Sequence, residues 1–237
     1  MSEPTFDAVV AARHSCRAFL PEPVADEELL EVLALAQGAP SWCNTQPWQV
    51  HLVTGTATAA FAAYLSAAVH DEAPTPDLPG PERYEGVYRD RRRASGYALY
   101  ASLGIERDDH ARRGEQMLRN FSFFGAPHVL VVTTDPLQGV YGAVDCGGFV
   151  STLMLAAASR GLGTCAQAAV AMYAAPVRRF LDVGEDRQVV CAIAIGRPDP
   201  DHPANGFRTE RASSDEVVSV VTAPPGHVDA GRGPAGA

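Results

Sequence analysis

The order of apolar and polar residues along the chain predicts more helix than strand. In several segments apolar residues recur every three to four positions, as one buried helix face requires. These segments predict helices over residues 5–13, from Asp26 as N-cap to Gly38, and over 56–69, 140–160, 174–182 and 213–221. Short apolar runs predict strands over 48–53, 128–134 and 188–195. The predicted fold class is α+β, with a mixed, mostly antiparallel sheet flanked by helices.

The middle of the chain departs from this pattern. Residues 71–83 contain four prolines, which exclude a regular element there. Residues 84–120 are polar, helical in spacing and rich in arginine, which is typical of a solvated face; a basic patch for an acidic partner is the alternative. We expect a single domain over residues 1–222 and a flexible, glycine-rich tail over 223–237. The excursion at about 71–125 is the natural place for a lid over a pocket.

Composition narrows the possible partners. The 237 residues are 46% hydrophobic, enough for one full core, and the formal charge of −9 argues against nucleic acid, whose binding needs a basic surface. All 19 basic side chains are arginine, which excludes a P-loop lysine and a pyridoxal phosphate anchor. Any bound phosphate must therefore be held by arginine, backbone amides or a helix end.

Cysteine and histidine spacing adds no metal or disulfide signal. The five cysteines are widely spread and odd in number, which favours reduced thiols, and the histidines lack metal-binding spacing. The first four residues are acidic and without an apolar core, so we expect no signal peptide. The longest uncharged apolar run, residues 146–159, is too short to span a bilayer. We expect a cytoplasmic protein without a membrane partner.

Residues 40–48 form a candidate binding loop, Pro40-Ser41-Trp42-Cys43-Asn44-Thr45-Gln46-Pro47-Trp48. Two prolines enclose a polar run between a predicted helix and a predicted strand, so rigid elements hold both ends. The amides of Asn44 and Gln46 can each donate and accept hydrogen bonds, as the edge of a heteroaromatic ring requires. The alternative is an ordinary helix-to-strand connection with Trp48 in the core.

A second stretch, Arg13-His14-Ser15-Cys16-Arg17, closes the first predicted helix. Together the two stretches resemble the nitroreductase family of FMN-dependent oxidoreductases, which carries an Arg-x-Ser-x-Arg/Lys run followed by a Pro-Ser-x-x-Asn-x-Gln-Pro-Trp loop. The segments 161–169 and 208–211 also fit, so the resemblance covers residues 5–220. It implies an intertwined homodimer that binds FMN at its interface and takes electrons from NADPH or NADH.

The resemblance also implies which residues bind FMN. Arg13 and Arg211 would hold the phosphate, with Arg208 as a weaker candidate. His14 and Ser15 would lie on the ribityl and phosphate side, and Arg17 near the pyrimidine edge of the ring. The remaining implied contacts are Pro40, Ser41, Trp42, Asn44 and Gln46 from the other subunit's loop, and Gln167, Ala168 and Ala169, of which Ala168 or Ala169 would place a backbone amide near flavin N5.

Some positions complicate this assignment. The run Gly161-Leu162-Gly163-Thr164-Cys165-Ala166 matches a loose dinucleotide pattern, but it follows a helix and leads into an extended segment, so it is not a Rossmann site. Ser151 stands where many relatives carry glutamine, and Arg197 where an aromatic residue is common. Trp42 is larger than the residue that many relatives have, and would narrow the pocket over the flavin.

The predicted function is reduction of nitroaromatics, quinones or similar small aromatic acceptors with NAD(P)H by ping-pong hydride transfer. No catalytic side chain is expected, because the flavin carries the reaction and the protein supplies position and electrostatics. Two alternatives stay open. One is a flavin store or sensor without efficient turnover, and the other is a specialised relative that removes a halogen or cleaves flavin.

Overall fold

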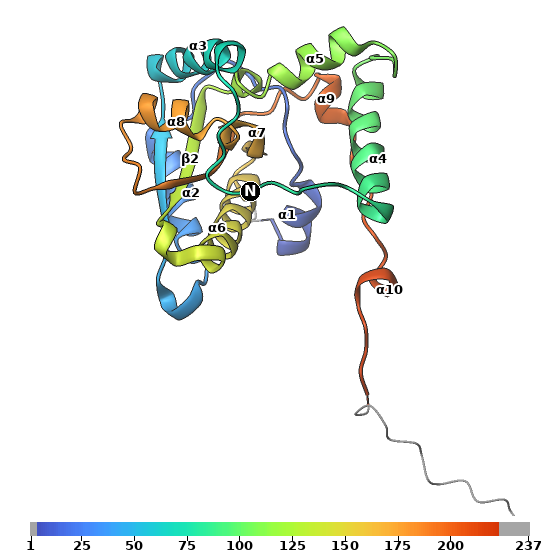
Figure 1. Cartoon of the computed structure of the whole chain (residues 1–237). Helices are drawn as coiled ribbons and strands as arrows, with labels where there is room; N and C mark the ends of the chain where they lie inside the picture. Colours follow the sequence, from blue (N-terminus) through green and yellow to red (C-terminus); the bar gives the residue numbers. More distant parts are fainter. Residues whose placement is uncertain (1–3, 223–237) are drawn as a thin grey trace, which may run out of the picture.

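The structure is a computed structural model that describes residues 4–222 (Figure 1). The predicted flexible tail, 223–237, lies outside the described residues. The elements in chain order are α1 (Phe6–Ala12), α2 (Asp26–Ala36), η1 (Trp42–Asn44), β1 (Trp48–Val53), α3 (Thr56–Asp71), α4 (Gly86–Ser102), α5 (His110–Leu118), η2 (Phe123–Gly125), β2 (His128–Thr134), η3 (Pro136–Gln138), α6 (Gly139–Ser159), β3 (Gly163–Gln167), α7 (Ala168–Ala171), α8 (Ala174–Leu181), β4 (Gln188–Gly196), α9 (Pro203–Gly206) and α10 (Ser214–Val217).

The four strands form one sheet in the order β1-β2-β4-β3. Every neighbouring pair is antiparallel, and the only parallel contact among the described residues is an isolated bridge between Ser15 and Thr164. All seven residues of the central strand β2 are buried, which explains its nearly continuous apolar sequence. The predicted α+β class, with a mostly antiparallel sheet between helices, is confirmed.

Alternate residues of the central strands face two separate cores. Val129 and Val131 of β2 pack with α3, α8 and η2 on one side of the sheet. Leu130 and Val132 pack with α2 and α6 on the other. Successive side chains of a strand point to opposite faces, so a strand covered by helices on both sides needs apolar residues at every position. The result is three layers, with the sheet between two sets of helices (Figure 1).

Helix α6 is buried along one face only. Cys146, Phe149 and Leu153 lie in the core, whereas Val140 is 78% and Val144 59% exposed. The helix is therefore central along the face that contains these core residues, whereas part of its apolar surface is exposed in the single chain. By length and composition α6 could also cross a membrane, but its buried face packs against the sheet. Its exposed apolar face is a surface that a folded chain normally covers.

Several predicted boundaries need correction. Asp26 is the first residue of α2 rather than its cap, a position that Ala25 occupies. The helix predicted over 213–221 shrinks to α10, whose capping box joins Ser213 and Glu216 but cannot extend the helix beyond Val217. The helical stretch predicted over 84–120 divides into α4 and α5 around Gly104, which has a positive φ of 61°.

The excursion at 71–125 leaves the body of the protein and returns to it. Its proline-rich beginning is anchored by Asp77, which pairs with Arg178 of α8 and accepts a hydrogen bond from the Val189 amide at 2.8 Å. Beyond this anchor α4 stands at the side of the molecule, where it contacts α9 and the C-terminal segment (Figure 1). A cavity lies between α4 and this C-terminal segment.

Candidate functional site

The arginine-rich stretch 13–17 is held against strand β3. The Cys16 amide donates to the Thr164 carbonyl at 2.9 Å. A Cβ atom at Gly163 would lie 2.9 Å from the Cys16 sulfur, so only glycine permits this close approach. The glycine segment after α6 therefore positions the candidate phosphate-binding stretch, rather than binding a dinucleotide. The rejection of a Rossmann site is supported, because this segment follows a helix and leads into a strand.

Asn205 connects the same stretch to the C-terminal segment. Its side-chain oxygen accepts from the Arg17 amide at 2.8 Å, and its side-chain nitrogen donates to the Ala18 and Asp199 carbonyls at 2.8 and 2.9 Å. These three bonds bring Arg208 beside Arg13, 195 positions earlier in the chain. Sequence analysis missed Asn205, because no local pattern reveals a partner so distant in sequence.

Six of the predicted site residues line one cavity of about 450 Å³: Arg13, His14, Ser15, Arg17, Arg208 and Arg211. Val10 and Ala11 of α1, Phe207 and Thr209 also line it, and Ser95 reaches it from α4. None of the four arginines forms an ion pair within residues 4–222. Unpaired guanidinium groups gathered around a cavity are suited to an anion such as a phosphate.

His14 supplies a different kind of contact to this cavity. Its Nδ1 lies 2.9 Å from the Ala12 carbonyl, whereas its Nε2 is buried without a partner among the described residues. Burial lowers the pKa of His14, and Arg208, Arg13 and Arg17 lower it further. The ring is therefore neutral near pH 7, with Nδ1 as donor and Nε2 as a free acceptor. A free acceptor fits a hydroxyl group better than a bare phosphate oxygen.

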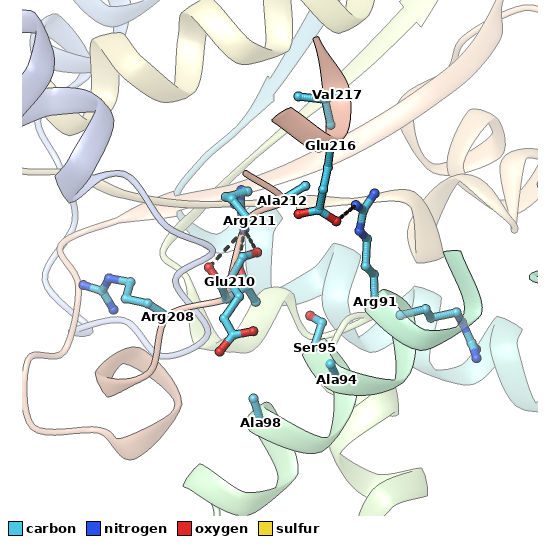
Figure 2. Close-up of a pocket in the computed structure, with 12 residues that line it drawn as sticks. Arg91, Ala94, Ser95, Ala98, Arg208, Glu210, Arg211, Ala212, Glu216 and Val217 are labelled. Atoms are coloured by element: carbon cyan, nitrogen blue, oxygen red, sulfur yellow. Dashed lines mark hydrogen bonds and ion pairs between the residues drawn. The ribbon is translucent and has the colours of Figure 1, made fainter. Parts of the chain in front are cut away.

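The cavity continues into a larger space between α4 and the C-terminal segment, of about 930 Å³. Figure 2 shows Ser95 and Ala98 on the α4 side, and Arg208 and Arg211 on the opposite side. Arg91 and Glu216 form an ion pair that joins α4 to α10. Ser95, Arg208, Thr209 and Arg211 line both spaces, so the two are continuous.

The candidate loop 40–47 has an unusual backbone. Cys43, Asn44 and Gln46 have φ values of 48°, 58° and 47°. Residues other than glycine pay about 1 kcal/mol or more each for this left-handed conformation, so surrounding contacts must hold the loop. Ser41 provides one such contact, because its hydroxyl accepts from the Gln46 amide at 2.9 Å.

The ends of the loop are fixed to the core. Trp48 is buried, stacks on Phe149 with ring centres 5.0 Å apart, and donates from Nε1 to the Gln37 side chain at 3.0 Å. Trp48 therefore lies in the core, where the alternative interpretation of this loop had placed it. Arg187 donates to the Pro47 carbonyl at 3.3 Å. In contrast, Trp42, the single aromatic residue within 40–47, remains 56% exposed.

Gln167, Ala168 and Ala169 lie where β3 turns into α7. The extended segment expected after the glycine run is β3, which ends at Gln167, and Ala168 begins a helix. The Gln167 side chain is 2% exposed and donates to the Asn120 carbonyl at 2.7 Å, so it points into the protein. The amides of Ala168 and Ala169 belong to the first turn of α7, where no intrahelical acceptor exists.

Within one chain the loop and the arginine cavity are far apart. The loop contacts Tyr141 and Asp145, in the first half of α6. The arginine stretch lies beside Ala158, at the end of the same helix. The rise of an α-helix places Asp145 and Ala158 about 20 Å apart along its axis. The structure therefore brings the phosphate-side residues together but leaves the loop outside their cavity.

Two of the positions at which the chain departs from the family pattern, Ser151 and Arg197, do not line this cavity. Ser151 is exposed on the same α6 face as Val144. Arg197 pairs with Glu28 at 2.8 Å, and its carbonyl accepts from the Leu20 amide. Arg197 thus connects the end of β4 to α2 in a single chain.

The cysteines nearest this site are buried thiols. Desolvation raises the pKa of both Cys16 and Cys165 to about 11. At neutral pH neither is a thiolate, so neither can act as a nucleophile. Within residues 4–222 no three histidine, cysteine or acidic side chains come together as a metal site. The cavity can therefore bind and orient an anionic ligand, and its described residues contain no activated nucleophile of their own.

Comparison with known proteins identifies the family. A sequence model of the Nitroreductase family matches residues 10–197. The chain is 38% identical to 4-nitrobenzoate reductase of Pseudomonas putida, over 87% of this chain and 91% of that protein. It is also 38% identical to nitroreductase NfnB of Mycolicibacterium smegmatis, over 91% and 94% of the two chains.

Solved structures agree with the sequence comparison. The FMN- and NADPH-dependent nitroreductase NfnB from Sphigopyxis sp. strain HMH superposes with a TM-score of 0.89 at 35% identity, over 92% of this chain and 99% of that one. FMN-dependent NfnB from Mycobacterium smegmatis, in complex with NADPH, gives 0.87 at 36% identity, over 91% and 97%. The family predicted from the two N-terminal motifs is confirmed: this chain belongs to the nitroreductase family.

Proposed function

We propose that this protein is an FMN-dependent oxidoreductase that uses NADPH or NADH to reduce nitroaromatics, quinones or similar aromatic acceptors. Relatives that match almost the whole chain are named nitroreductases, and neighbouring structures are FMN- and NADPH-dependent. These comparisons confirm the enzyme class and the cofactor that the sequence predicted. The natural acceptor and the preference between the two nicotinamide donors belong to the proposal.

The observation that carries the proposal is the arginine cavity. Arg13, Arg208 and Arg211 would hold the FMN phosphate, because four unpaired guanidinium groups surround this space and the chain has no lysine. Ser15 and the free Nε2 of His14 would contact the ribityl hydroxyls. Arg17 would approach the pyrimidine edge of the ring. The donor set therefore fits FMN.

The ring would lie between elements of two chains. Ala168 or Ala169 would donate a backbone amide to the ring, and Gln167 would contribute backbone only, since its side chain is turned inward. Pro40, Ser41, Trp42, Asn44 and Gln46 of the loop would approach from the other subunit. When bound, FMN supplies the hydride-transfer chemistry between donor and acceptor. The chain's own residues bind it, orient it and limit access to it.

A homodimer explains two otherwise separate observations. The first is the exposed apolar face of α6, which includes Val140 and Val144. The second is the separation of the loop and the arginine cavity along α6. Two α6 helices that pack antiparallel about a two-fold axis would cover this face and place the loop of one chain at the cavity of the other. The projecting segment 207–222, with exposed Val217 and Val220, would pack on the second chain (Figure 1).

The proposal also covers the domain organisation, the lid and the cellular location of the protein. We propose a single domain over residues 1–222, in which α4 and α5 act as the lid over the pocket. The open space between α4 and the C-terminal segment supports such a role. We also place the protein in the cytoplasm, as is expected for a nicotinamide-dependent enzyme without a disulfide framework.

Steady-state kinetics test the proposed reaction. Reduction of a nitroaromatic and of a quinone at several NADPH concentrations should give parallel double-reciprocal lines, because donor and acceptor would use the same site in turn. The same assay with NADH gives the donor preference. Intersecting lines, or no turnover with either acceptor while bound FMN remains reducible, would refute this mechanism and favour a store, a sensor or a specialised relative.

A further inference from the structure

Asp145 contacts the candidate loop from an otherwise uncharged helix. It is the only carboxylate among the 21 residues of α6, which contain no arginine, lysine or histidine. Its two carboxylate oxygens lie 3.2 and 3.1 Å from the Trp42 amide nitrogen, and it forms no ion pair in the described part of the chain. A single carboxylate on an apolar helix is therefore directed at the backbone of the loop.

One helical turn earlier, Tyr141 contacts the Trp42 side chain. The two ring centres are 4.3 Å apart with planes inclined by 54°, a favourable aromatic arrangement. Residues four apart lie on the same helix face. Tyr141 and Asp145 thus hold the ring and the amide of Trp42 together. Trp42 is still 56% exposed, so part of its ring remains free to contact another molecule.

The residues after Trp42 need such a restraint. Cys43, Asn44 and Gln46 all have positive φ values, and an unrestrained loop would leave this conformation. The Ser41 hydroxyl fixes the Gln46 amide from within the loop. Only the Asp145 and Tyr141 contacts, among those that the structure records at Trp42, join this part of the loop to a rigid helix.

We propose that Asp145 and Tyr141 are positioning residues that lock the 40–47 loop, so that Trp42 sets the width of the acceptor site. This inference rests on the proposed function, in which the loop lies beside the flavin. It predicts that loosening the lock changes selectivity between acceptors of different size. A purely structural role would instead lower stability without changing that selectivity.

Two pairs of variants test the lock in the FMN-loaded protein. Asp145→Ala removes the amide acceptor, and Asp145→Asn keeps an oxygen at the same place without the charge. Tyr141→Ala removes the ring, and Tyr141→Phe keeps it. We expect hydrogen exchange of the 40–47 backbone to become at least about tenfold faster in both alanine variants, because a charge-assisted hydrogen bond or a ring contact is lost. Tyr141→Phe should match the wild type, and Asp145→Asn should be intermediate.

The second readout is the ratio of kcat/KM for a single-ring nitroaromatic to that for nitronaphthalene. In both alanine variants we expect this ratio to shift at least about fivefold towards the larger acceptor, mainly through KM, as a site gains room. Unchanged exchange, or faster exchange with an unchanged ratio, would overturn the proposal. If Asp145→Ala fails to fold, the Tyr141 pair decides by the same criteria. A wild-type protein that binds no FMN and reduces neither acceptor would refute the proposed function itself.

Discussion

Replacing Arg211 with alanine is expected to weaken FMN binding by about tenfold to a hundredfold. A charged hydrogen bond to a phosphate contributes about 1.5–3 kcal/mol, and each 1.4 kcal/mol is a factor of ten in Kd. Arg211 lines the cavity beside Arg13 and Arg208, and the chain has no lysine that could replace it. The dissociation constant can be measured by titrating the apoprotein with FMN and following the loss of flavin fluorescence.

Two further variants test whether FMN affinity depends on an arginine at position 211 or only on the total charge of the protein. Arg83→Ala removes another exposed arginine, which pairs with Glu85 and lines neither the cavity nor the adjoining space, and should leave FMN affinity unchanged. Arg211→Lys keeps the charge but loses the planar fork, and should fall between wild type and alanine. If Arg211→Ala purifies with full FMN content and unchanged affinity, the phosphate has been assigned to the wrong residues.

Mixed dimers are expected to recover activity that neither parent has. One parent carries Arg13→Ala with Arg211→Ala, which removes the phosphate side of the site. The other carries Ser41→Ala with Asn44→Ala, which removes the loop side. If each site takes these parts from different chains, a mixed dimer contains one intact site and one site with both defects. Random pairing of equal amounts would then restore about a quarter of the wild-type sites.

Different affinity tags on the two parents allow the mixed dimer to be purified after co-expression. Its FMN content and turnover are then compared with those of each parent alone. A site built within one chain would leave every site defective, and the mixture would be as inactive as its parents. A protein that is monomeric in solution and retains FMN would contradict the shared site in the same way.

The sequence was informative where local patterns decide the structure. The nearly continuous apolar run of β2 predicted a buried strand, and Gly161, with a φ of 72°, follows the end of α6 as expected. The sequence was less informative where a surface would contact a second protein chain. The exposed valines of α6 look like core residues in sequence, because an apolar interface and an apolar core have the same composition. The sequence analysis also set no end to the extended segment after Gly163, although the alanine-rich sequence from Ala168 favours the helix that begins there.

The residues of the candidate site were likewise only partly predictable from the sequence. The motifs around Arg13 and Pro40 pointed to the family, because they preserve the order and spacing of a known pattern. The residues that assemble the site have no such signal. Asn205 bonds to Arg17 across 188 positions, and Asp145 to Trp42 across 103. A lone asparagine or aspartate reveals such a partner only when the fold is known.

The central claim is that a flavin bound to this protein accepts electrons from a nicotinamide and passes them to an aromatic acceptor. Its most direct test is the absorption spectrum of the purified protein, followed without oxygen as NADPH is added and a nitroaromatic is added afterwards. We predict rapid bleaching of the flavin band by NADPH and its return with the acceptor. A protein that lacks a flavin band, or whose band persists after NADPH addition, would contradict the claim.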